Sequence, residues 1–174
     1  MTTRRGYTLI EVLIVVTVLG IAASMVVPAF SQTNTLRLQG AVRSIVADIT
    51  QAQSDAVAMQ IGQGLTFFAD AENSRYLIAP VSGTSLDTAS DIVVNRRIGG
   101  AEFGHATFAN ITFPSNTLVF DAMGGPVASA GSDTPAATGR IDIVTATQTY
   151  RIVVEAYTGR VTVQSIELSS ETLP

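Results

Sequence analysis

The hydrophobic pattern of the chain begins with one long apolar segment. Residues 7–30 are almost continuously apolar, and no charged residue lies between Glu11 and Arg37. A helix rises about 1.5 Å per residue, so a segment of this length can cross the roughly 30 Å hydrocarbon core of a membrane. We therefore predict a transmembrane helix over residues 7–30. Pro28 lies inside it, and we expect a bend there because proline removes a backbone donor.

From Leu36 the pattern becomes that of an amphipathic helix. Apolar residues recur at spacings of three and four, which places them on one helical face. These residues are Leu38, Val42, Ile45, Ile49, Ala52, Ala56 and Met59. We expect the helix to run to Gln60 or Ile61, to end at Gly62 and Gly64, and to pack this stripe on a sheet. A stripe that binds a partner is the alternative interpretation.

Beyond Gly64 the chain alternates between apolar and polar residues in short runs, as β-strands do. The strands that we expect cover residues 65–70, 75–80, 91–97, 110–113, 117–121, 140–145, 148–156 and 159–165. Thr158 and Gly159 predict a tight turn between the last two strands. The small and polar segment 122–139 is interpreted as a mobile, structureless surface loop or as a contact for a neighbour or cargo. The predicted fold is α+β: a long N-terminal helix packed on a mainly antiparallel β-sheet domain with one or two sheets.

The segment ahead of the apolar helix is short and basic. Arg4 and Arg5 favour a cytoplasmic N-terminus and an outward C-terminal domain. An ordinary secretory signal fits poorly, because its apolar region is about 7–15 residues long and ends at a cleavage site; here apolar residues continue to Phe30. A plain signal anchor fits the length and orientation but does not explain Glu11.

Glu11 is the single charged side chain of the apolar segment. A carboxylate inside an apolar helix costs several kcal/mol unless it is neutralised or paired. Two interpretations follow. Glu11 lies near the cytoplasmic interface and reaches water, or it finds a charged partner when the protein assembles.

The residues around Glu11 carry a family resemblance. Gly6 is followed by Tyr-Thr-Leu-Ile-Glu-Val-Leu-Ile-Val-Val, which resembles the type III signal of type IV pilins and type II secretion pseudopilins. Tyr7 stands where that family usually has Phe. The resemblance implies a pilin-like fold, cleavage after Gly6 by prepilin peptidase and N-methylation of Tyr7. It also implies that Glu11 pairs with the Tyr7 amine of a neighbouring subunit and that Pro28 marks a bend.

The C-terminal half resembles, more loosely, the GspH/FimT-type minor pseudopilins. The shared order is a Phe-Asp-containing strand, a Gly-rich loop, an apolar strand, Tyr-Arg-Ile-Val-Val and then Gly-Arg-Val. GspH-like members lie at or near the tip of the type II secretion pseudopilus. FimT-like members have been linked to DNA uptake through a Gly-Arg-x-Arg motif. Thr162 replaces the second arginine here, so Arg160 is only a weak DNA-binding candidate.

We expect a GspH-like minor pseudopilin of a type II secretion pseudopilus, with a FimT-like minor type IV pilin in pilus biogenesis or DNA uptake as the alternative. It would cross the inner membrane once and place its C-terminal domain in the periplasm. The expected partners are other pilins or pseudopilins, prepilin peptidase, the inner-membrane assembly platform and the lipid bilayer. The expected parts are a leader (1–6), a transmembrane and filament-core helix (7–30), an amphipathic helix (31–61), a β-rich periplasmic domain (62–168) and a flexible tail (169–174).

The composition argues against several kinds of functional site. The ten basic residues, all arginine, face fourteen acidic residues, and the net charge is −4, so we do not expect nucleic acid as a partner. The absence of cysteine excludes disulfides and Cys-based zinc sites. His105 is the only histidine, so a catalytic triad would need it. We expect no catalytic, metal or cofactor site; an enzyme on a plain signal anchor would leave the Gly6–Glu11 motif unexplained.

Overall fold

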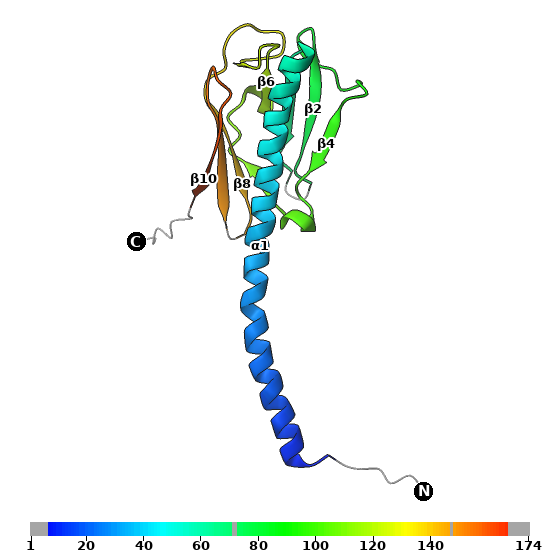
Figure 1. Cartoon of the computed structure of the whole chain (residues 1–174), viewed down its shortest axis with the longest axis vertical. Helices are drawn as coiled ribbons and strands as arrows, with labels where there is room; N and C mark the ends of the chain where they lie inside the picture. The colour runs from blue at the N-terminus through cyan, green and yellow to red at the C-terminus, as the bar shows by residue number, and fades with distance from the viewer. Residues whose placement is uncertain (1–6, 71–72, 147, 167–174) are drawn as a thin grey trace.

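A computed structural model of the chain consists of one long helix and two antiparallel sheets (Figure 1). It describes residues 7–70, 73–146 and 148–166, without the side chains of residues 24–34. Helix α1 (Leu9–Met59) lies with its C-terminal half in front of both sheets in Figure 1, whereas its first turns lie far from them. The predicted α+β, pilin-like arrangement is confirmed, and it has two sheets.

The first sheet has six strands in the order β3-β2-β1-β6-β7, with β4 also paired to β2. Its central strand, β1, is antiparallel to both neighbours and places Leu65 opposite Ile78 and Leu118. The strands are β1 (Gln63–Phe68), β2 (Arg75–Ser82), β3 (Ser85–Leu86), β4 (Val94–Arg97), β6 (Thr117–Phe120) and β7 (Pro126–Val127).

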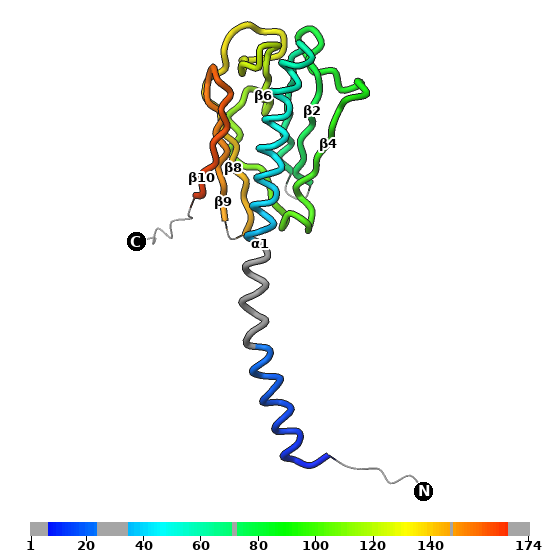
Figure 2. Tube along the Cα trace, in the orientation of Figure 1, coloured from blue at the N-terminus to red at the C-terminus, as the bar shows by residue number. Residues whose placement is uncertain are grey.

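The second sheet has four strands in the order β10-β9-β8-β5, all antiparallel. They are β5 (Thr107–Ala109), β8 (Gly139–Val144), β9 (Thr149–Val154) and β10 (Val161–Ile166). The chain enters this sheet at β5 after the short helix η1 (Ala101–Phe103). It returns to the first sheet through η2 (Pro114–Asn116) and β6, and crosses back at β8. In Figure 2 the two sheets flank the upper part of α1.

The predicted apolar stripe of α1 packs on the sheets, with one exception. Its members from Leu38 to Ala56 are buried, whereas Met59 keeps 48% of its surface exposed. The inclusion of Met59 was therefore wrong, because the helix ends at this residue: Gln60 takes a left-handed conformation with φ 54° and caps it. Each fully buried large side chain of the stripe contributes about 1.5–3 kcal/mol to folding.

An aromatic cluster joins the helix to both sheets. Phe67 of β1 meets Phe108 of β5 edge to face, with ring centroids 5.3 Å apart, and Tyr76 of β2 lies 5.9 Å from Phe67. The Tyr76 hydroxyl donates a hydrogen bond to Asp48 of α1 at 2.6 Å. Burial, together with this neighbouring carboxylate, raises the pKa of Tyr76 well above its ordinary value. Tyr76 therefore stays neutral and holds the helix in register with the sheets.

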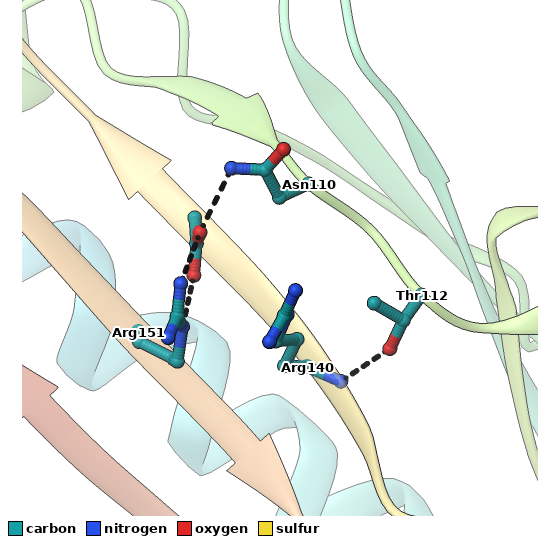
Figure 3. Close-up of polar contacts among 5 residues, drawn as sticks. Asn110, Thr112, Arg140 and Arg151 are labelled. Atoms are coloured by element: carbon teal, nitrogen blue, oxygen red, sulfur yellow. Dashed lines mark hydrogen bonds and ion pairs between the residues drawn. The ribbon is translucent and has the colours of Figure 1, made fainter.

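A polar cluster lies on the face of the second sheet that points away from the helix, and it links the strands of that sheet (Figure 3). Asp142 of β8 is 2% exposed and accepts two hydrogen bonds from Arg151 of β9, at 2.7 and 2.9 Å. Asn110 donates a third at 3.0 Å. The hydrogen bonds from Arg151, helped by Asn110, hold the pKa of the Asp142 carboxyl below its usual range. The ionised carboxylate therefore connects β8 and β9 to the end of β5.

Two β-domain expectations were wrong. Residues 110–113 do not form a strand, because Asn110 has φ 46° and ends β5 at Ala109. Segment 122–139 is not structureless: it contains β7, a bridge between Val127 and Pro135, and buried Ala136. Small residues allow this segment to fold tightly without giving a regular apolar pattern.

Candidate functional site

The first turn of α1 is closed by a reciprocal pair of hydrogen bonds. Thr8 is the N-cap residue, with extended φ and ψ of −78° and 151°. The Glu11 backbone N–H donates to Thr8 Oγ1 at 3.3 Å, and the Thr8 N–H donates to Glu11 Oε2 at 3.4 Å. This capping box satisfies two donors that a helix start leaves unpaired. It also places the carboxylate at the positive end of the helix dipole, where negative charge is favoured.

Tyr7 and Glu11 lie together at this end of the helix. With Val12 and Val15 they line one shallow hollow on the helix surface. The Tyr7 side chain is 82% exposed. The structure therefore brings the two predicted processing and assembly residues to one place, within reach of another molecule.

The helix surface beyond this end is apolar on every side. Its large apolar side chains each keep between 51% and 85% of their surface exposed. They are Tyr7, Leu9, Ile10, Val12, Leu13, Ile14, Val15, Val16, Val18, Leu19 and Ile21. A helix that is apolar all round is stable only when lipid or other protein covers it. Eleven of the exposed large apolar side chains in the described part of the chain therefore lie on this one stretch of helix.

The predicted transmembrane segment is described only in part. Among the residues whose placement is described, no helical stretch is both long enough and apolar enough to cross a membrane. Residues 24–30 of the segment, Pro28 included, lie outside the described side chains. The bend at Pro28 therefore stays a prediction.

The remaining predicted residues do not join this site. Gly6 lies outside the described residues, as does the tail over residues 169–174. Arg160 is exposed in the connection between β9 and β10, at the far end of the second sheet, where its N–H donates to Thr158. Within the described part of the chain, no group of three His, Cys, Asp or Glu side chains is placed to hold a metal ion.

Sequence reasoning missed the role of Thr8. The signal was present, because Thr8-Leu9-Ile10-Glu11 has the T-x-x-E spacing of a capping box before an apolar run. The sequence prediction assigned Glu11 only an assembly role. It did not include its local role, in which Glu11 is the third helical residue and caps the start of its own helix. Glu11 thus has a structural partner within its own chain.

Comparison with known proteins finds similarity in the N-terminal segment and over most of the chain. The family described as prokaryotic N-terminal methylation motif matches residues 1–27. The chain is also 29% identical over 137 residues to the pilin-like protein PilA1 of Thermus thermophilus, a match that covers 71% of this chain and 80% of the relative. No solved structure matches the chain.

Proposed function

We propose that the chain is a type IV pilin-like protein whose apolar helix forms the core of a filament and whose two sheets face outward; the matched methylation motif and the likeness to PilA1 support this family. Proteins of this family are structural subunits and not enzymes, and they assemble with other pilins after prepilin-type processing. The observation that carries the proposal is the all-round exposure of residues 9–21. Packing this surface against neighbouring helices, or leaving it in lipid before assembly, removes it from water.

The capping box supports a specific assembly step. Cleavage after Gly6 creates an amine at Tyr7, and the Glu11 carboxylate of another subunit can pair with it. Among the described residues of the single chain, the Glu11 carboxylate accepts one hydrogen bond, from the Thr8 N–H, and that bond is long, at 3.4 Å. Exchanging it for a charged amine in an apolar filament core strengthens the interaction. A charge that is fully satisfied only in the assembled state favours the correct register between subunits.

At the finer level we propose a GspH-like minor pseudopilin of a type II secretion system. It would sit in the inner membrane with Arg4 and Arg5 on the cytoplasmic side and the sheets in the periplasm, and an assembly platform would move it into the filament. The resemblance of the C-terminal strands to the GspH/FimT type supports this proposal. A FimT-like minor type IV pilin is the alternative, and the acidic balance of the chain is evidence against a DNA-binding version of it.

We expect a Gly6→Leu substitution to block processing and filament entry. A peptidase site that accepts glycine without a side chain has no room for leucine. Immunoblots of membrane and filament fractions should show the longer, uncleaved chain in the membrane only. Gly6→Ala is the matched control and should be cleaved in part. Normal cleavage and normal filament entry of Gly6→Leu would contradict the proposed processing.

A further inference from the structure

Strand β10 is an open sheet edge with unusual properties. It pairs with β9 in an unbroken register over all six of its residues, and its other side has no strand among those described. Its sequence, Val-Thr-Val-Gln-Ser-Ile, contains no charge and no proline. Proteins normally protect such edges with charged residues, proline, bulges or very short strands, because unpaired backbone groups bind other strands.

The other described sheet edges are protected in these ways. β3 and β7 have two residues each, and β5 has three. β4 ends in Arg96 and Arg97. Among the described strands, β10 is thus the one edge that is both long and uncharged. In Figure 1 it forms the outer border of the second sheet, at the end of the order β10-β9-β8-β5.

An apolar groove runs between this edge and the helix. It has a volume of about 490 Å³ and is lined by Gln39, Val42, Arg43, Val46, Ala47, Tyr150 and Val163. Val163 of β10 keeps 44% of its surface exposed on this side. A strand added to β10 would point every second side chain into the groove, since side chains alternate along a strand.

The groove contains one charge, and that charge has no partner in the described part of the chain. Arg43 is exposed, and among the described residues it makes neither an ion pair nor a hydrogen bond. By contrast, Arg96 pairs with Asp48, and Arg151 pairs with Asp142. A ligand that offers a carboxylate beside Arg43 would complement the groove.

We propose that β10 binds an extended segment of a partner protein as an added strand, with apolar side chains in the groove and an acidic side chain beside Arg43. Backbone hydrogen bonds would supply affinity, and the groove with its single cation would supply specificity. The partner is a different protein and not a second copy of this chain. None of the described edge strands carries an acidic residue that could pair with Arg43. The β4 strand of a second copy would instead bring its Arg96 and Arg97 close to Arg43, where like charges repel. This surface lies on the β domain, and the proposed binding at it does not require cleavage after Gly6.

The test uses the full chain in detergent and two short fluorescent peptides, blocked at both ends. Both alternate valine and threonine; one has aspartate and the other lysine at the same central, groove-facing position. By fluorescence anisotropy we expect the aspartate peptide to bind about fivefold more tightly, the size of effect that one exposed ion pair gives. Arg43→Glu should reverse this preference. Hydrogen exchange should slow at the amides of residues 161–166 when the aspartate peptide is bound.

A matched pair of substitutions at Val163 separates strand addition from loss of folding. Val163→Asn removes the apolar, branched side chain from the edge without adding a charge and should weaken binding of the aspartate peptide about fivefold, whereas Val163→Thr keeps the branched shape and should change it by less than about twofold. Three results would overturn the proposal. The two peptides could bind wild type with equal affinity, neither could bind, or the aspartate peptide could bind without slowing hydrogen exchange at residues 161–166. Self-association of the chain that Val163→Asn abolishes would overturn it too, by assigning the edge to a second copy. None of these failures would affect the proposed processing and filament core.

Discussion

Replacing Glu11 by valine should leave membrane insertion intact and reduce filament incorporation about tenfold or more, because a buried amine then loses its partner. Valine continues the apolar surface of the helix, so lipid accepts it readily. The mature Tyr7 amine of the neighbour would be buried among apolar side chains without a counter-charge. Quantitative immunoblots of the membrane and filament fractions measure the effect directly.

Glu11→Gln is the control that separates charge pairing from helix capping. The glutamine amide oxygen can still accept the Thr8 N–H, so the capping box is retained. The negative charge is lost, and we expect Glu11→Gln to assemble almost as poorly as Glu11→Val. Normal assembly of Glu11→Gln would show that capping alone explains the residue and would contradict the pairing.

Replacing Asp142 by alanine should lower the free energy of unfolding of the β domain by about 2–3 kcal/mol. The change leaves the Arg151 guanidinium and the Asn110 amide without the acceptor that both share (Figure 3). The effect stays below that of a fully buried charge because Arg151 keeps 28% of its side chain exposed. Asp142→Asn, which keeps an acceptor oxygen, should cost about half as much. Thermal unfolding monitored by circular dichroism measures the stability of both variants. Ordinary surface substitutions change stability by less than about 0.5 kcal/mol. A loss below that value for Asp142→Ala would contradict the role of Asp142 as the shared acceptor.

The same carboxylate makes stability depend on pH. Its pKa in the folded chain lies below the unfolded value of about 3.9, so folding favours the ionised form. The stabilisation is therefore complete above about pH 5 and is lost as the pH falls through the folded pKa. Between pH 5 and pH 2, roughly, wild type should lose more stability than Asp142→Asn, which has no carboxyl to protonate there. Equal losses in the two proteins would contradict the assigned ion pair.

The helix and most of the strands could be predicted because their patterns are regular. The three- and four-residue spacing of apolar residues from Leu38 to Ala56 is compatible with only one buried face of the helix, and that face is buried. The alternation around Ile141 and Ile152 likewise identified β8 and β9, which pair at those residues. In these segments local propensity and tertiary packing favour the same structure.

The errors arose where backbone conformation rather than pattern decides. Asn110 adopts a left-handed conformation that few residue types favour, and it ends β5 where the apolar pattern continues towards Phe113. β3 and β7 have only two residues each, too few to show alternation. The partnership of Asp142 with Arg151 was invisible because it depends on which strands pair. At the site, Thr8 could have been found from its spacing to Glu11, whereas the groove beside β10 required the packing of α1 on the second sheet.

The central claim is that the chain is processed and assembled through its N-terminus. The most direct test is the intact mass of the protein isolated from its native membrane or filament fraction, with fragmentation to locate its first residue. We predict a chain that begins at Tyr7 and carries one methyl group on its terminal nitrogen. A chain that retains Met1, or that begins at a residue other than Tyr7, would contradict the claim.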